Sequence, residues 1–565
     1  MPKAQWHIPK RFQLMAITIL CLSTSGSSAA TFTRDIAPVL YKRCSPCHHD
    51  RQSAPFSLVT YSDVIKHAKQ IAEAVNSGLM PPWLPDPNPS GFLNDRSLSA
   101  SEKALILSWI SEGTPEGDPA ILPKAPQWPQ GWLLGKPDLV LTMPKPFLLG
   151  PDGGDVYRNF VIPSGLSSNV NIRAVEFHAG NPKVMHHSFI KVDETHKSAI
   201  LESMGNGVGF EGMNSGAKMP TGQFLTWQPG KLPVSTGPVW TLSKNSDLVF
   251  ETHMHRSGKP ETVSSSIGLY FTQKSASTNF VKILLGSLAL NILAGDTNYV
   301  VEDSFVLPTD CDVSSVLPHA HYLCTEMKAW AELPTGTAKQ ILIIRHWDFN
   351  WQGDYQYAAP IPLPKGTKLK IRYTYDNSTN NLKNPNNPPK NVYYGTQSSD
   401  EMCEFWIQLV VRDGAHRIAI ETAFQQKSKD LLEKSILSKL TRNPGDSQSL
   451  SDLGLLRIGD GKYAEAEKLF QRAIQANPDD DTSHYRLGLV YRITNRFSDS
   501  DAELLRAVSL NPRNAPAWGN LGYVKAGLGD AEGAKTAFRQ ALDIDPTDVY
   551  AKAALKELEA LPKKP

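Results

Sequence analysis

The sequence predicts a multidomain protein with a small α-helical domain, two antiparallel β-sandwiches and a C-terminal α-helical solenoid. Three observations support this fold class. A cysteine motif near the N-terminus lies between helical patterns, β-prone runs alternate with turns through the middle, and the last part repeats at a fixed period. A chain of 565 residues is also too long for a single core. We expect five segments: 1–30, 31–120, 121–275, 276–425 and 426–562.

The overall charge argues against two classes of partner. The 58 Lys and Arg residues nearly balance the 56 Asp and Glu residues, which leaves a formal net charge of +2. Proteins that bind nucleic acid or an anionic membrane surface usually carry a strong positive excess. We therefore expect no nucleic acid and no membrane surface among the partners.

The N-terminus has the pattern of a secretory signal. Lys3, Lys10 and Arg11 are basic, residues 14–22 are almost entirely apolar, and small residues lead up to Ala30. The apolar run is much shorter than the roughly 20 residues that span a bilayer. We expect cleavage near Ala30, no membrane span after cleavage, and a periplasmic or secreted protein. The alternative is a retained membrane anchor.

The run Cys44-Ser45-Pro46-Cys47-His48 has the pattern of haem c attachment. Each thiol can bond a haem vinyl group, and His48 can supply an axial nitrogen to the iron. The alternatives are a redox dithiol, which does not need the histidine, and half of a zinc site, which needs a second pair of ligands nearby. The pattern therefore predicts one covalently bound haem c at Cys44, Cys47 and His48.

The residues on both sides of this motif have helical patterns. Residues 35–41 carry apolar side chains at helical spacing, and Ser99 opens a capping box before another apolar helix. This segment resembles a small class I cytochrome c, a family in which the sixth iron ligand is often a methionine from a loop. The resemblance implies Met80 as that ligand. His67 and His49 are the alternatives, and Met80 could also simply fill the core.

The middle of the chain has the character of an all-β region. A linker rich in Pro and Gly covers about 115–150, and short β-prone runs bounded by turns begin towards its end. Strands at such spacing are typical of β-sandwiches, and the region is long enough for two. The runs are 139–142, 170–178, 248–255, 266–272, 368–375 and 404–411.

Four stretches of this region carry side chains that bind metals. They are His186-His187, His253 with His255, His319-Ala320-His321, and Met402-Cys403. Pro318 predicts an edge strand or a strand end before His319, so His319 and His321 share one face and can bind one metal. Imidazole suits copper in either redox state and thioether selects Cu(I), so this set of donors can hold copper in both.

In their order along the chain and in their local sequence, these stretches resemble the copper type II, ascorbate-dependent monooxygenases. That family includes peptidylglycine α-hydroxylating monooxygenase and dopamine β-monooxygenase. The matching residues are His186-His187, Phe250-Glu251-Thr252-His253, His319-Ala320-His321 and Asp400-Glu401-Met402-Cys403. The run 264–271 also resembles the family's strand after the third histidine, and the resemblance covers about 130–420.

The resemblance implies two copper ions with different roles. One, on the N-terminal sandwich, would store and pass an electron, and its ligands would be His186, His187 and His253. The other, on the C-terminal sandwich, would bind dioxygen and hydroxylate a C–H bond of a small molecule or a peptide. The ligands of this catalytic copper would be His319, His321 and Met402.

Two features of the first histidine set leave alternatives. Adjacent residues of a strand point to opposite faces, so His186 and His187 can share a metal only across a bend or a bulge. His255 competes with His253, because residues two apart on a strand lie on the same face. The resemblance favours His253.

The cysteines depart from the family pattern. The resemblance implies a disulfide between Cys403 and a cysteine on a neighbouring strand, but the run 371–375, which matches that strand, contains none. Cys403 then pairs with Cys311 or Cys324, or stays free. Cys324, three residues after His321, could instead approach the copper.

The C-terminal part repeats every 34 residues. The dipeptides Asn477-Pro478, Asn511-Pro512 and Asp545-Pro546 follow this period, as do Gly454, Gly488 and Gly522. Gly in a first helix and Pro after a second helix are typical of the tetratricopeptide (TPR) repeat. We expect three repeats, a capping helix over about 426–441, and a protein partner in the concave face. The alternative is a passive stabilising cap.

These patterns lead to one functional hypothesis. We expect an exported copper monooxygenase with two copper ions and one haem c, in which electrons pass from the haem to the first copper and then to the oxygen-binding copper. One alternative is a non-catalytic periplasmic haem and copper protein, a redox or sensor protein that recruits partners through its TPR repeats. Another is a plain electron-transfer cytochrome with β-sandwich adaptors.

Overall fold

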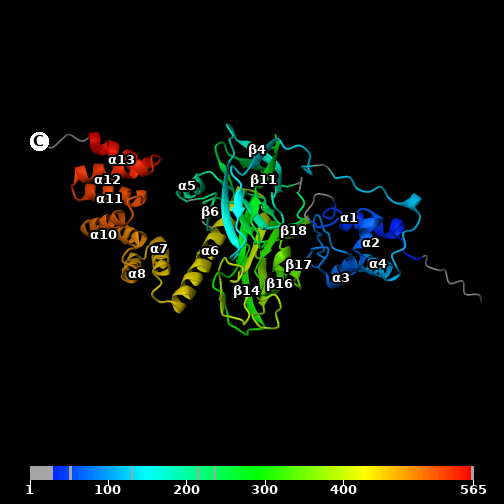
Figure 1. The fold of residues 1–565 in the computed structure, drawn as a ribbon. Coiled ribbons are helices and arrows are strands. Elements are labelled where there is room, and N and C mark those ends of the chain that lie inside the picture. The colour runs from blue at the N-terminus through cyan, green and yellow to red at the C-terminus, as the bar shows by residue number, and fades with distance from the viewer. Residues whose placement is uncertain are drawn as a thin grey trace, which may run out of the picture. The chain divides into compact units, whose positions relative to one another are not determined.

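The computed structural model describes residues 29–49, 54–128, 131–205, 207–212, 216–233 and 237–560 (Figure 1). The chain divides into two compact units, one formed by Met1–Pro81 and Ser97–Pro126 and the other by Pro82–Arg96 and Gln127–Pro565. Residues 1–28, most of the expected signal segment, lie outside the described residues. Among the described helices, none is long and apolar enough to cross a membrane.

The first unit is a small helical fold with Phe32 and Trp109 at its buried centre. The helix predicted over 35–41 is confirmed within η1 and α1. Helix α4 begins at the predicted capping box, in which the Ser99 hydroxyl accepts a hydrogen bond from the Glu102 N–H. The elements are η1 (Phe32–Ile36), α1 (Ala37–Arg43), α2 (Tyr61–Lys66), α3 (Ala68–Ser77), α4 (Ala100–Ser111) and η2 (Pro119–Ile121).

The segment Pro82–Arg96 groups with the second unit, although both of its flanks belong to the first. Phe92 forms an isolated β-bridge with Tyr357, and their rings stack with centroids 5.2 Å apart. The domain predicted over 31–120 therefore contributes residues to both units.

The first β-sandwich follows the linker. Its larger sheets have the strand orders β1-β11-β4-β8 and β6-β3-β9-β5-β7, and β10 and β2 form a small ribbon. Apolar side chains from both larger sheets, such as Phe250 and Leu269, meet in one core. The elements are β1 (Leu139–Thr142), β2 (Phe147–Leu149), β3 (Val156–Pro163), β4 (Val170–His178), β5 (Met185–Asp193), α5 (Lys197–Met204), β6 (Phe210–Glu211), β7 (Thr226–Trp227), β8 (Trp240–Leu242), β9 (Asp247–Met254), β10 (Glu261–Val263) and β11 (Ser266–Thr272).

The second β-sandwich has the strand orders β12-β21-β15-β18 and β14-β19-β16-β17, and β13 and β20 form a small ribbon. Ile407 and Ile371 come from opposite sheets and meet in its core. The elements are β12 (Phe280–Gly286), β13 (Asn291–Ile292), β14 (Tyr299–Val306), β15 (Cys311–His319), β16 (Cys324–Glu332), β17 (Ala338–Ile344), η3 (Phe349–Trp351), β18 (Tyr355–Leu363), β19 (Lys368–Tyr375), β20 (Val392–Tyr393) and β21 (Glu404–Val410).

Alternating burial explains why these runs form strands. In β19, Leu369, Ile371, Tyr373 and Tyr375 are buried, whereas the residues between them are exposed or half-buried. An antiparallel sheet with one solvated face requires this period of two. The six predicted runs are confirmed as β1, β4, β9, β11, β19 and β21, with ends that shift by at most one residue.

The strand before His319 is predicted only in part. Its edge position is wrong, because β15 lies between β21 and β18. Its end is confirmed, since pairing with β18 stops at Val316 while pairing with β21 continues to His319. Pro318 lacks the N–H that a second neighbour would require, and it is tolerated where that neighbour has ended.

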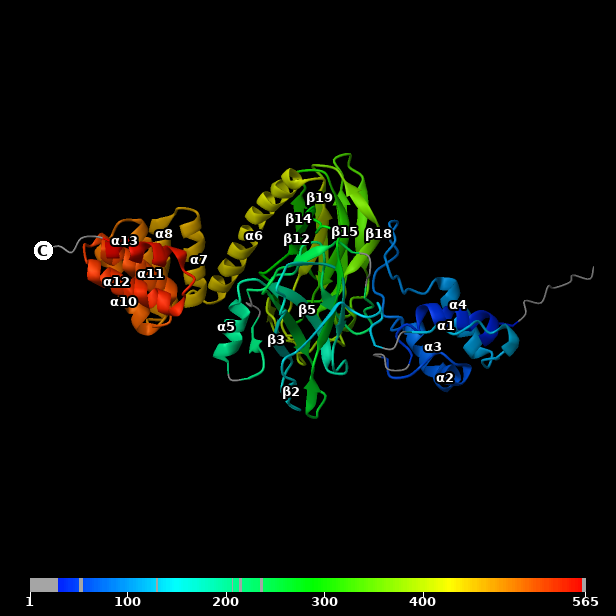
Figure 2. The same ribbon diagram turned by 90° about the horizontal axis from the view of Figure 1, so that it is seen from above.

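Helix α6 (Gly414–Arg442) joins the second sandwich to the helical repeat, and Figure 2 shows it as one continuous helix. Near its start, Ile420 is buried in the core of the second sandwich. Near its end, Glu433 forms an ion pair with Arg457 of α7 at 2.6 Å. The helix predicted over 426–441 is thus the second half of a longer helix.

The repeat itself consists of three helical hairpins and a final helix in the described residues. A glycine in the first helix of each hairpin allows close packing, because a Cβ on Gly454, Gly488 or Gly522 would lie 2.7 Å from a side-chain atom of the second helix. The helices are α7 (Ser447–Gly459), α8 (Tyr463–Ala476), α9 (Asp481–Ile493), α10 (Phe497–Leu510), α11 (Ala515–Gly527), α12 (Ala531–Ile544) and α13 (Val549–Ala560).

Replacing Gly522 with Ala should loosen the third hairpin, because the new Cβ would lie 2.7 Å from the Phe538 ring. Overpacking of this kind costs about 1–3 kcal/mol. The matched control is Gly519→Ala in the same helix, where the nearest atom is 3.8 Å away and Ala should stabilise the helix by roughly 0.5–1 kcal/mol. Hydrogen exchange of the α11 and α12 amides should accelerate only in the first variant. Equal protection in both variants would contradict the close-packing argument.

Candidate metal centre

A β-bulge brings the first histidine set together. Strand β5 pairs with β9, and the register shifts between Met185 and His187, so His186 is the extra residue. The Nδ1 atom of His186 lies 3.0 Å from Nδ1 of His187 and 3.1 Å from Nδ1 of His253. The bend or bulge that the adjacent histidines require is therefore present.

These separations suit a shared metal ion. Two nitrogens bound at about 2.0–2.1 Å to one ion lie roughly 3 Å apart when their bonds meet near a right angle. The second nitrogen of His186, Nε2, is buried and has no hydrogen-bond partner. The cluster therefore offers more nitrogen lone pairs than its own hydrogen bonds can satisfy.

Burial and neighbouring imidazoles keep the rings neutral. Burial is the largest effect, and together they lower the pKa of His186, His187 and His253 below the ordinary value for histidine. In the second histidine set, burial lowers the pKa of His321 to about 3. Neutral imidazole is the form that binds metals.

Asp155, immediately before β3, orients two histidines at once. Its Oδ1 accepts a hydrogen bond from His255 Nδ1 at 2.8 Å, and its Oδ2 lies 3.1 Å from His253 Nε2. The Ser398 hydroxyl, from the loop before Met402, also donates to Asp155. Burial by itself raises the pKa of Asp155, but these hydrogen bonds outweigh it and hold the pKa well below the usual range.

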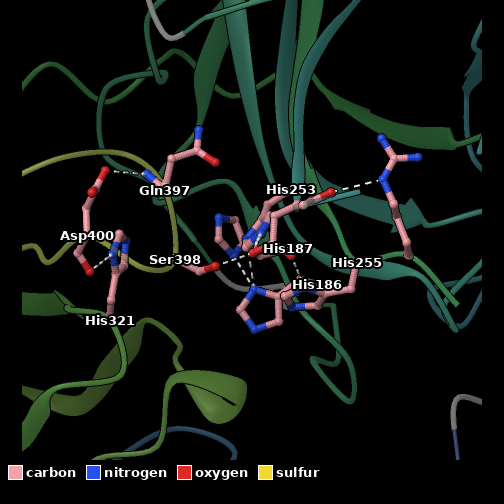
Figure 3. A network of polar contacts seen from close by, with 11 residues as sticks. His186, His187, His253, His255, His321, Gln397, Ser398 and Asp400 are labelled. Atoms are coloured by element: carbon pink, nitrogen blue, oxygen red, sulfur yellow. Dashed lines mark hydrogen bonds and ion pairs between the residues drawn. The ribbon is translucent and has the colours of Figure 1, made fainter. Parts of the chain in front are cut away.

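The choice between His253 and His255 is not exclusive in the structure. One ring nitrogen from each of His186, His253 and His255 lies within 4.8 Å of the other two. Figure 3 shows the four rings of His186, His187, His253 and His255 gathered beside Ser398. Both candidates therefore lie at the first histidine set.

The second histidine set lies at and just beyond the end of β15. The Nδ1 atom of His319 bonds to Gln352 Oε1 at 2.5 Å, and Nδ1 of His321 bonds to the Asp400 carbonyl at 3.1 Å. Because both acceptors are carbonyl oxygens, each Nδ1 carries the hydrogen and each Nε2 keeps its lone pair. This arrangement prepares two nitrogens for one metal.

Glu401 connects the two loops that carry this second set. Its carboxyl oxygens accept hydrogen bonds from the backbone N–H groups of His321, Leu323 and Met402, the last two at 2.8 Å. Burial raises the pKa of Glu401 to about 8, although these backbone N–H groups oppose the shift. The side chain is fully used within the protein and orients ligands rather than binding metal.

Both histidine sets face one pocket between the two sandwiches. The rings of His187 and His319 have centroids 6.3 Å apart. Phe349 is 1 % exposed and contacts both sets, with its centroid 4.5 Å from that of His186 and 5.3 Å from that of His321. The predicted ligands that line the pocket are His187, His253, His319, His321 and Met402.

The sequence reasoning missed four residues of this centre: Asp155, Phe349, Gln352 and Glu401. Glu401 stood inside a recognised motif, and an acid directly before a predicted ligand, Met402, was a usable signal. The other three come from distant parts of the chain and carry no local pattern that marks them.

The predicted haem-attachment motif forms a tight turn after α1. The His48 N–H donates to the Cys44 carbonyl at 2.9 Å, which holds both ends of the motif together. The Nδ1 atom of His48 bonds to the Phe56 carbonyl at 3.1 Å, so its Nε2 keeps the lone pair that an iron would need. Cys44 and Cys47 form no disulfide. The donor set therefore fits a covalent haem.

The candidates for the sixth iron ligand lie in different surroundings. Met80 follows α3, and its N–H donates to the Ala74 carbonyl at 3.1 Å. The His67 ring stacks on Phe56 with centroids 3.9 Å apart. His49 Nδ1 bonds to the Ser45 carbonyl at 2.8 Å.

The three remaining described cysteines are buried thiols. Cys311, Cys324 and Cys403 form no disulfide. Cys324 is part of the hydrophobic core of the second sandwich. Burial raises the pKa of all three thiols, so they remain protonated at neutral pH.

Comparison with known proteins identifies the helical repeat. Models of the tetratricopeptide repeat match residues 451–500 and 515–548. Similar solved structures include the first TPR domain of human RPAP3 (22 % identity, 21 % of this chain and 92 % of that chain, TM-score 0.20). The Arabidopsis OM64 TPR domain is also similar (21 % identity, 20 % of this chain and 94 % of that chain, TM-score 0.20). So is MamA (20 % identity, 24 % of this chain and 80 % of that chain, TM-score 0.22). No curated protein matches the chain. The C-terminal part thus carries TPR repeats.

Replacing Glu401 with Ala should destabilise the second sandwich, because three backbone N–H groups would lose their buried acceptor. Each unsatisfied group costs about 1–3 kcal/mol, so for three groups we expect the free energy of unfolding to fall by at least about 3 kcal/mol. The matched control is Glu302→Ala, whose side chain is 57 % exposed and lies 3.5 Å from Arg372. Such exposed pairs contribute less than about 1 kcal/mol. Urea unfolding measures both, and equal losses would contradict the role of Glu401.

Proposed function

We propose that the protein is an exported copper-dependent monooxygenase that hydroxylates a C–H bond of a small molecule or peptide with O2. The observation that supports this function is the meeting of two donor sets in one pocket, where the rings of His187 and His319 lie 6.3 Å apart. A nitrogen-rich set and a set with a thioether match the two copper sites that the family resemblance implies, because imidazole suits copper in either redox state and thioether selects Cu(I).

His186, His187 and His253 would hold the first copper, and His319, His321 and Met402 the second. Bound copper supplies one-electron transfer at the first set and, with a thioether that favours Cu(I), dioxygen binding at the second. The chain orients the ligands before any metal arrives. The bulge at His186 gathers the first set, and the carbonyl acceptors for His319 and His321 direct two Nε2 atoms of the second set into the pocket.

Aromatic side chains cover parts of both histidine sets. Phe349 is buried against both histidine sets, and Tyr157 stacks on His253 with centroids 4.1 Å apart. Burial raises the pKa of Tyr157, so its hydroxyl stays neutral at physiological pH. Protected surroundings of this kind prevent side reactions of reactive oxygen species.

The N-terminal unit would supply electrons. Cys44 and Cys47 would bind a haem c covalently, His48 would be one ligand of its iron, and Met80 or His67 would be the second. Bound haem carries one electron at a time. Because both units belong to one chain, delivery is intramolecular, with an effective concentration of order millimolar for a short flexible linker.

The TPR repeats would bring a protein partner to the enzyme. Arrays of this kind bind peptide or protein segments in the surface formed by their stacked hairpins. Partner binding by the repeats is proposed in addition to the catalytic function. A non-catalytic haem and copper protein that recruits partners is the alternative, and the copper count separates the two.

Titration of the metal-free, reduced full-length protein with Cu(I) against a competing chelator should reach two ions per chain. Met402→Ala should weaken the affinity for one ion by about tenfold or more, since a ligand is lost. The control is Met204→Ala, which removes a thioether from a residue that is 65 % exposed on α5. One ion per chain, or none, supports the redox or sensor alternative.

Electron delivery should appear in the haem spectrum. When the reduced, copper-loaded protein is mixed with O2, the absorbance of reduced haem should decay, and Met402→Ala should slow this decay at least about tenfold without altering the starting spectrum. Met204→Ala should behave as the parent protein. If O2 is consumed while the haem stays reduced, the N-terminal unit is not the electron source.

A further inference from the structure

The ring of His255 lies against the first histidine set, although the family resemblance gives it no role. It follows the last residue of β9, and its N–H donates to the Val184 carbonyl at 2.8 Å, so the chain stays paired beside β5. Residues two apart on a strand share a face, which directs His255 to the side of His253. The centroid of the His255 ring lies 4.6 Å from that of His186 and 4.8 Å from that of His253.

Asp155 determines which nitrogen of His255 is available. A carboxylate only accepts hydrogen bonds, so the 2.8 Å contact places the hydrogen of His255 on Nδ1 and leaves the lone pair on Nε2. That Nε2 is buried and has no hydrogen-bond partner, as is Nε2 of His186. Buried polar atoms without partners are costly and rare, and a carboxylate behind a histidine is the usual support of a metal ligand.

The centroids of the His187 and His255 rings lie 5.0 and 4.6 Å from that of His186, so His186 is a neighbour of both. One ring nitrogen from each of His186, His253 and His255 lies within 4.8 Å of the other two. We propose that His255 is a fourth nitrogen ligand of the metal held by His186, His187 and His253, oriented by Asp155. This assignment rests on the proposed function in so far as that cluster binds copper.

A fourth nitrogen has a chemical consequence. Cu(II) favours tetragonal coordination by nitrogen ligands, whereas Cu(I) binds well to fewer and softer ligands. His255 therefore stabilises the oxidised ion more than the reduced ion. Its removal should weaken Cu(II) binding more than Cu(I) binding and raise the reduction potential of the site.

The test uses the full-length protein with His319→Ala and His321→Ala, so that copper occupies the first set alone. Electron paramagnetic resonance of the Cu(II) form counts bound nitrogens, and chelator competition measures both affinities. His255→Ala should lower the nitrogen count by one and weaken Cu(II) binding at least about tenfold, with a smaller change for Cu(I).

Two further variants complete the design. His196→Ala is the matched control, because His196 bonds an aspartate, Asp247, through Nδ1 at the same 2.8 Å but is absent from the cluster, and it should change nothing. Asp155→Asn keeps the His255 ring and should weaken Cu(II) binding about 10–100-fold, which covers the case that His255→Ala fails to fold.

The outcomes are separable. An unchanged nitrogen count and unchanged affinities in His255→Ala would overturn the ligand assignment and leave the copper site intact. A parent protein that binds no copper at this set would overturn the proposed function together with the assignment. A second ion bound at the set, lost only with His255, would overturn the single-metal arrangement.

Discussion

The buried carboxyl group of Glu401 is the contact on which the second half of the candidate metal centre depends. It accepts backbone N–H groups from the loop of His321 and from Met402, two segments that lie 80 residues apart in the chain. The bond from His321 Nδ1 to the Asp400 carbonyl joins the same two loops a second time. Because the oxygens of Glu401 already accept hydrogen bonds from the backbone, the side chain orients His321 and Met402 without competing with them for a metal.

A second set of contacts sets the relation between the two sandwiches. Asp155 of the first sandwich accepts a hydrogen bond from His255 of the same sandwich. It also accepts one from the Ser398 hydroxyl of the second sandwich. Phe349 of the second sandwich packs against His186 of the first. Each half of the centre thus contributes a side chain to the support of the other half, which explains how two separately folded cores can present one pocket.

The proposed chemistry assigns each part of the chain a distinct task. The N-terminal unit provides the cysteines and the histidine suited to haem, the sandwiches provide nitrogen and sulfur donors, and the TPR repeats provide a surface for a partner. The segment Pro82–Arg96 is of interest in this scheme. It begins two residues after Met80, and its Phe92 forms a β-bridge with Tyr357 of β18.

The sequence by itself determined the elements and the kinds of donor. β-Prone runs bounded by turns located six of the strands within one residue, the period of 34 located the repeat, and the residues around His186, His253, His319 and Met402 predicted a metal centre. These signals are local, because they follow from the periods of strand and helix. Only the tertiary structure decided which donors meet. A bulge at His186, the placement of His255 beside Asp155, and the approach of Phe349 and Gln352 all depend on strand register and loop packing across long distances in the chain, which no local pattern encodes.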